Sequence, residues 1–114
     1  MNAVIENMKT RRSVRAFDPE RMPERSLIEA VAEAGTYAPT GRGAQSPLIV
    51  AVTSKAVRDR LSELNAAVMG TKADPFYGAP VVLVVLADRT RPTYLYDGSL
   101  VMGNMMNAAH ALGL

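Results

Sequence analysis

The sequence predicts one domain that contains both helices and strands. Its length of 114 residues suits a single hydrophobic core. Two short apolar runs, at residues 48–53 and 81–87, are typical of strands. Four longer stretches carry apolar residues at helical spacing. The expected order is therefore helix, helix, strand, helix, strand, helix, without an internal repeat.

The first two predicted helices lie on either side of a basic segment. A short amphipathic helix is indicated by Val4, Ile5 and Met8. The second helix is expected to begin at Met22-Pro23, because proline suits the first turn, and to end at Gly35 as a left-handed stop. Its buried stripe comprises Leu27, Ile28, Val31 and Ala34. Residues 37–47 hold two prolines and two glycines and are predicted to form a loop.

The middle of the chain reads as strand, helix, strand. Residues 48–53 are expected to form a buried strand, and Ser54 can cap a third helix that contains Val57, Leu61, Leu64 and Val68. Arg58 is expected to be an exposed residue of that helix. After a loop at residues 70–80, residues 81–87 are apolar at every position, which predicts a strand covered on both faces.

The last predicted helix, at about residues 93–112, has hardly any polar face. Such a helix is expected to be buried all round or to lie in a subunit interface. A sheet of two strands is also small for a stable domain. We therefore expect the domain to be incomplete as it stands or to be completed by another chain.

Composition and charge exclude several classes of function. There are no cysteines and only one histidine, which excludes disulfides, thiolate metal sites and cysteine catalysis; no metal site is predicted. No apolar run is long enough to span a bilayer, so no membrane partner is expected. The N-terminus lacks the apolar core of a signal peptide, so we expect a cytoplasmic rather than a secreted protein. The net charge of +2 is weak support for a nucleic-acid partner, and none is predicted.

Basic residues are concentrated near the N-terminus, where Arg11, Arg12, Ser13 and Arg15 follow the first helix. Three guanidiniums and a hydroxyl offer many hydrogen-bond donors, which suits a phosphate. Two other interpretations stay open at this point. The segment could be a solvated run of charge, or its arginines could pair with Glu6, Asp18 and Glu20.

A second candidate is the loop at residues 38–45, which contains Pro39, Thr40, Gly41 and Gln45. It could present backbone N–H groups to a planar polar ligand, or it could be a plain connection. Neither a Walker loop nor a dinucleotide fingerprint fits it. His110, on an apolar helix, is expected to be a core or interface residue, and no catalytic acid or base is nominated.

Together these segments resemble the nitroreductase family of FMN-dependent oxidoreductases. Residues 8–17, MKTRRSVRAF, look like the family's N-terminal signature. Tyr37-Ala38-Pro39-Thr40-Gly41 with Gln45 resembles its second motif, and residues 76–80, FYGAP, resemble its third. Residues 97–114 look like its long central helix. The four motifs occur in the family's order along the whole chain.

The resemblance implies an α+β fold, with helices around a central antiparallel or mixed sheet, in one domain at residues 1–114. It also implies an intertwined homodimer with FMN in each of two interface clefts. Arg11, Arg12 and Ser13 would hold the phosphate and ribityl chain, and Arg15 would lie near the pyrimidine end of the flavin. Pro39, Thr40 and Gly41 would come from the partner subunit, and Gln45 matches the same motif. The family's C-terminal part has no counterpart in this sequence, so we expect an incomplete fold.

The function implied is an oxidoreductase in which NAD(P)H reduces FMN, which then reduces a small-molecule acceptor such as a nitroaromatic or a quinone. Two alternatives stay open. One is a truncated FMN-binding or dimer-forming fragment with little turnover. The other is an anion- or nucleic-acid-binding module that uses the arginine cluster, which would show binding that falls steeply with salt.

Overall fold

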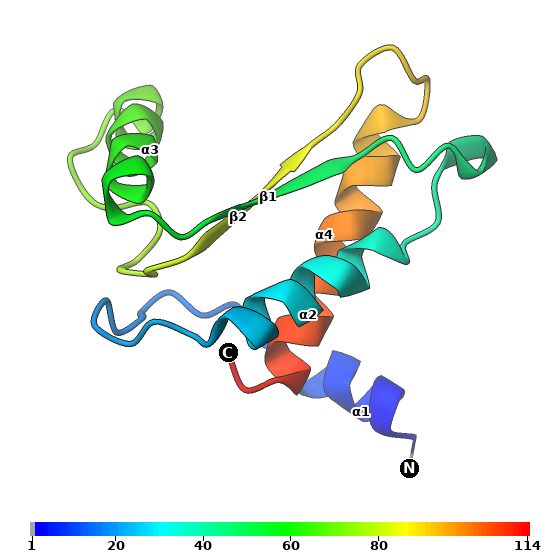
Figure 1. The fold of residues 1–114 in the computed structure, drawn as a ribbon, viewed down its shortest axis with the longest axis horizontal. Coiled ribbons are helices and arrows are strands. Elements are labelled where there is room, and N and C mark those ends of the chain that lie inside the picture. Colours follow the sequence, from blue (N-terminus) through cyan, green and yellow to red (C-terminus); the bar gives the residue numbers. More distant parts are fainter. Residues whose placement is uncertain (1) are drawn as a thin grey trace.

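The computed structural model describes residues 2–114 and confirms the predicted α+β fold and its order of elements (Figure 1). The elements are α1 (Ala3–Thr10), α2 (Arg25–Thr36), β1 (Leu48–Val52), α3 (Lys55–Met69), β2 (Val82–Leu86) and α4 (Tyr94–Ala111). A short 3-10 turn, Gly41–Gly43, precedes β1. Among these residues no helix combines the length and the apolarity that crossing a membrane requires.

Both predicted ends of α2 were wrong. The helix begins at Arg25 rather than at Met22-Pro23, because the first helical hydrogen bonds run to the carbonyl of Glu24, from the N–H groups of Leu27 and Ile28. Gly35 does not end the helix but lies inside it, where it is buried. A Cβ at Gly35 would come within 2.8 Å of both Ile49 Cδ1 and Met105 Cγ. Gly35 therefore allows close packing rather than a left-handed turn.

The core lies between α2, α4 and one face of the sheet. Val31, Ala38, Val101 and Met105 form its buried cluster, against which Ile49, Leu83, Val85 and Ala109 pack. Asn104 adds a polar link, since its side-chain amide donates to the carbonyl of Ala34 at 3.0 Å. Helices α2 and α4 consequently cross in close contact beneath the sheet, as Figure 1 shows.

Strands β1 and β2 pair antiparallel, with Leu48 opposite Leu86 and Val52 opposite Val82. The predicted burial of these strands was only half right. Ile49, Leu83 and Val85 face the core, whereas Leu48, Val50 and Leu86 are exposed. Helices α2 and α4 cover one face of the sheet; on the opposite face Val52, at the end of β1 that leads into α3, is buried.

Helix α3 lies beyond the ends of the strands, away from α2 and α4 (Figure 1). Its start is capped as predicted, because the Ser54 hydroxyl accepts from the N–H of Val57. Arg58 was expected to be exposed, and that was wrong: its side chain retains only 11% of its accessible surface. The reason is a set of contacts with the loop at residues 74–79, described below.

Helix α4 is buried on one side only. Val101 and Met105 face the core, whereas Leu95, Tyr96, Leu100, Met102 and Met106 are exposed. Val4, Ile5 and Met8 of α1 are exposed as well. The prediction that α4 is buried on all sides is thus wrong within residues 2–114. The alternative, that α4 lies in a subunit interface, stays a prediction. Exposed apolar residues gathered on two neighbouring helices are typical of an interaction surface.

Candidate functional site

The arginine segment begins beside the C-terminal end of α4. The Asn7 side chain donates to the carbonyl of Asn107 at 2.8 Å, and Thr10 Oγ1 lies 2.9 Å from His110 Nε2. These two contacts hold α1 against α4. At Arg11 the backbone leaves the helix and becomes extended, with ψ of 138°. The predicted phosphate-binding residues therefore begin at the end of α1, which is held against α4.

The guanidiniums of this segment have no acid partner within residues 2–114. The ion pairs among the described residues involve Arg25, Lys55, Arg58 and Arg60 as the bases, and none involves Glu6, Asp18 or Glu20. Arg12 turns back to donate to the carbonyls of Lys9 and Arg11, at 2.8 and 2.9 Å. Arg11 is half-buried, and Ser13 and Arg15 are exposed. Most of the donors in this segment therefore stay available to an anion.

Phe17, two residues after Arg15, is fixed to the loop that precedes β2. Its N–H donates to the carbonyl of Tyr77 at 3.0 Å. Gly78 lies close to the carbonyl of the same residue, because a Cβ there would lie 3.0 Å from the Phe17 carbonyl oxygen. Tyr77 and Gly78 both have positive φ, 54° and 82°. Residues 77 and 78 of the third motif thus contact Phe17, the last residue of the first motif.

Asp74 and Arg58 hold that loop against α3. Arg58 forms an ion pair with Asp74, donates from Nε to the Ala79 carbonyl at 2.8 Å, and lies over the Phe76 ring. Asp74 also accepts from Ser62 and from the N–H groups of Phe76 and Gly78. Burial raises the pKa of the Asp74 carboxyl, but these donors outweigh it, so the pKa lies well below its ordinary value.

The second candidate loop is anchored at the opposite end of α4. Gly41 N–H donates to Asp97 at 2.9 Å, and Thr93 donates to the other oxygen of Asp97 at 2.9 Å. Thr40 Oγ1 accepts from the N–H of Gln45 at 2.9 Å. A Cβ at Gly41 would lie only 2.2 Å from Thr93 Oγ1, so this position requires glycine. Pro39 is exposed beside these residues.

Asp97, in the first turn of α4, is the acid of this site. It is only 2% exposed, and its carboxylate joins the Gly41 loop to the first turn of α4. An acid in the first helical turn is a common capping signal. That signal could place Asp97 at the start of α4, but it could not identify Gly41 as the distant donor.

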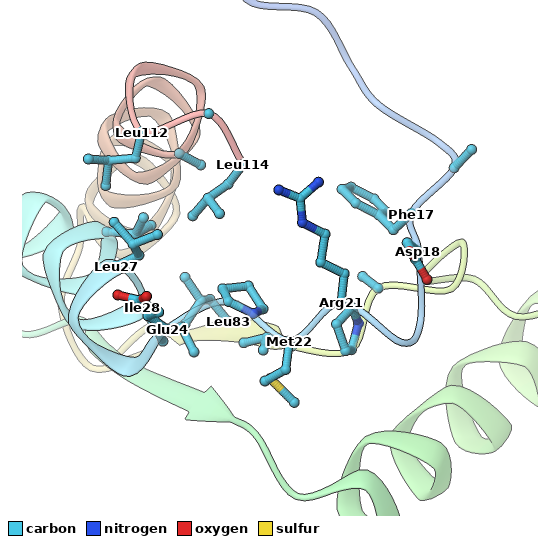
Figure 2. A pocket seen from close by; sticks show the side chains of 18 residues that line it. Phe17, Asp18, Arg21, Met22, Glu24, Leu27, Ile28, Leu83, Leu112 and Leu114 are labelled. Atoms are coloured by element: carbon cyan, nitrogen blue, oxygen red, sulfur yellow. The ribbon is translucent and has the colours of Figure 1, made fainter.

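Two cavities lie near the predicted residues, and neither joins the two groups. One, of about 330 Å³, is lined by Thr40 and Gln45 together with the end of α2 and Ile49. The other, of about 670 Å³, lies between α2, the start of β2 and the end of α4. Figure 2 shows the Arg21 guanidinium directed into it between Phe17 and Leu114. Its lining begins at Ala16 and includes none of the predicted cofactor residues.

One chain does not bring the two groups of predicted residues together. Thr10 contacts His110 and Gly41 contacts Asp97, and residues 97 to 110 span about 20 Å of helix axis. A ligand pocket of up to about 1,000 Å³ is on the order of 12 Å across if compact. In Figure 1 the segment after α1 also runs away from the 41–43 turn.

The residues 2–114 contain no cluster of three or more histidine, cysteine, aspartate or glutamate side chains that could hold a metal ion. His110, the single histidine, is half-buried and engaged with Thr10. The polar chemistry of the site is therefore that of guanidiniums, hydroxyls and backbone N–H groups. Such a set can bind an anion and a planar polar ring, and it offers no arrangement for nucleophilic catalysis.

Comparison with known proteins gives consistent results. The model of the Nitroreductase family matches residues 8–114. A curated protein of Methanothermobacter thermautotrophicus, whose name describes an NADH dehydrogenase or NAD(P)H nitroreductase, is 27% identical over 115 aligned positions. That alignment covers 97% of this chain and 57% of the relative, so the chain spans little more than half of the relative's length.

Solved structures are similar over nearly the whole chain. A nitroreductase with bound FMN from Bacteroides fragilis superposes with a TM-score of 0.86 at 29% identity, covering 99% of this chain and 67% of that one. An FMN-bound nitroreductase from Desulfitobacterium hafniense gives the same TM-score and coverage at 27% identity.

Proposed function

Because the chain belongs to the nitroreductase family, we propose that it binds FMN and contributes to an FMN-dependent oxidoreductase. The observation that carries this proposal is the Arg11–Arg15 segment, whose guanidiniums are free of acid partners within residues 2–114. The similar proteins of Bacteroides fragilis and Desulfitobacterium hafniense have bound FMN, so FMN is the ligand that we expect for this segment. A phosphate next to a flavin ring suits this combination of donors.

The residues present fit the cofactor. We propose that Arg11, Arg12 and Ser13 hold the phosphate and ribityl chain, because guanidinium forks and a hydroxyl match phosphate oxygens. Arg15 would lie toward the pyrimidine end, where its charge favours an anionic reduced ring. Bound FMN would supply hydride and electron transfer between NAD(P)H and an acceptor such as a nitroaromatic or a quinone. The chain's own part is to bind and orient it.

We further propose that each FMN is held between two copies of the chain. Pro39, Thr40, Gly41 and Gln45 lie about 20 Å of helix away from the arginine segment in one copy, so a second copy has to supply them. The exposed apolar residues of α1 and α4 offer a surface for that second copy. The 41–43 turn of one subunit would then border the ring held by the arginines of the other.

Purified protein tests the proposal. After incubation with FMN and removal of the excess, we expect a yellow protein that oxidises NAD(P)H only when a quinone or nitroaromatic is added. Binding of FMN without that oxidation would favour a flavin-binding fragment with little turnover. Protein that stays colourless with added FMN, but binds DNA or RNA in a steeply salt-dependent manner, would contradict the flavin proposal.

A further inference from the structure

We propose that the Asp74–Arg58 pair is a positioning device for the flavin site, which acts through Phe17 on Arg15. The inference rests on the proposed function, since it assumes that Arg15 faces the flavin. Neither Asp74 nor Arg58 touches the predicted cofactor residues. Their effect would pass through the loop at residues 74–79, which connects α3 with the arginine segment.

The first step is that the pair shapes the loop. Arg58 binds both of its ends, the Asp74 carboxylate and the Ala79 carbonyl, while Asp74 accepts from the N–H groups of Phe76 and Gly78 inside it. Ser62 adds a second contact from α3 to Asp74. Every one of these bonds ends on Asp74 or Arg58, so loss of either side chain removes several at once.

The second step is that the loop determines where Phe17 lies. The Tyr77 carbonyl accepts from the Phe17 N–H at 3.0 Å, and the Cα of Gly78 adjoins the Phe17 carbonyl. Both loop residues adopt positive φ, a conformation in which Tyr77 persists only when its surroundings impose it. The contacts of Asp74 with the neighbouring N–H groups supply that constraint.

The third step is that Phe17 determines where Arg15 lies. Within residues 2–114, the stretch from Ser13 to Ala16 makes no hydrogen bond. Arg12 is fixed on one side of it by its bonds to Lys9 and Arg11, and Phe17 is fixed on the other. Releasing Phe17 would therefore leave Arg15 on a chain held at one end only.

A double-mutant cycle tests this chain of contacts. We expect Asp74→Asn to weaken FMN binding by about 3- to 10-fold in the parent and by less than about 2-fold in an Arg15→Ala background. Asp88→Asn is the matched control, because Asp88 also accepts hydrogen bonds within its loop but is exposed, and among the described residues its hydrogen bonds reach only Thr90 and Arg91. Gly78→Ala, whose Cβ would press on the Phe17 carbonyl, perturbs the same link while both charges of the ion pair remain in the sequence.

Equal losses of FMN binding in the two backgrounds, or no loss in either, would overturn the proposal, because a general loss of structure does not depend on Arg15. Hydrogen exchange of the Phe17 amide, measured without cofactor, gives a second readout. We expect faster exchange in Asp74→Asn and Gly78→Ala than in Asp88→Asn, and unchanged exchange would overturn the proposal. If the parent binds no FMN, the proposed function fails, whereas the exchange data still decide whether the pair positions Phe17.

Discussion

Replacement of Arg11 by alanine is expected to weaken FMN binding by about 10- to 100-fold. A hydrogen bond to a charged group contributes about 1.5–3 kcal/mol, and a net loss of about one such bond to the phosphate corresponds to roughly this factor. Arg11 is half-buried at the end of a helix that Asn7 and Thr10 hold against α4, so little ordering is needed on binding. Equilibrium titration followed by flavin fluorescence measures the effect.

Arg60→Ala is the matched control for this experiment. Its side chain is exposed and pairs with Glu63 on the same helix, so its removal should leave FMN binding unchanged. Arg58 cannot serve as the control, because it is buried and bound to Asp74. Riboflavin, which lacks the phosphate, adds a second comparison: its binding should be nearly the same in the parent and in Arg11→Ala. Equal losses of FMN binding in Arg11→Ala and Arg60→Ala would contradict the phosphate assignment.

Replacement of Asp74 by alanine is expected to lower the free energy of unfolding by about 1–3 kcal/mol at neutral pH. Leaving partly buried donors without their acceptor costs about this much, and the charge of Arg58 keeps a second partner in Asp59, 3.3 Å away. Here Arg58 would lose its main partner, and the N–H groups of Phe76 and Gly78 would lose their acceptor. Urea unfolding of the two proteins measures the difference.

The destabilisation should depend on pH in a definite direction. The pKa of Asp74 is lower in the folded chain than its unfolded value of about 3.9, so the folded state favours the charged carboxylate. Its contribution is complete above the unfolded pKa and is lost as pH falls through the folded pKa. The gap in stability between the parent and Asp74→Ala should therefore narrow below about pH 4. A gap that widens in acid would contradict this role.

The order of elements could be predicted from local patterns because each element carries its own signal. Ser54 marks the start of α3, and the apolar runs mark β1 and β2. Gly35 shows where such reasoning fails. Glycine is a common helix stop, but here tertiary packing against Ile49 and Met105 decides its role. That contact joins residues far apart in the sequence, so no local pattern could reveal it.

Burial was the least predictable property. Arg58 reads as an exposed helix residue because arginine usually lies at the surface, and its partner Asp74 belongs to a separate loop. The strands read as buried because they are apolar, yet Leu48, Val50 and Leu86 are exposed on the face opposite α2 and α4. The candidate cofactor residues are predicted from their motifs. The opposite placement of the two groups along α4 required the structure.

The central claim is that arginines of one copy and the 39–45 loop of another form one flavin site. It is tested most directly by a heterodimer of two defective chains, one carrying Arg11→Ala with Arg12→Ala and the other Gly41→Val. The valine would collide with Thr93 and displace the loop. With different affinity tags on the two chains, the mixed dimer can be purified and its bound FMN measured alongside both parental variants.

If the site is shared, the mixed dimer has one intact site, formed by the arginines of the Gly41→Val chain and the loop of the double-arginine variant. We predict one FMN per mixed dimer and almost none on either variant alone. If each chain built its own site, both sites of the mixed dimer would be defective. A mixed dimer that folds and stays colourless would therefore contradict the shared site.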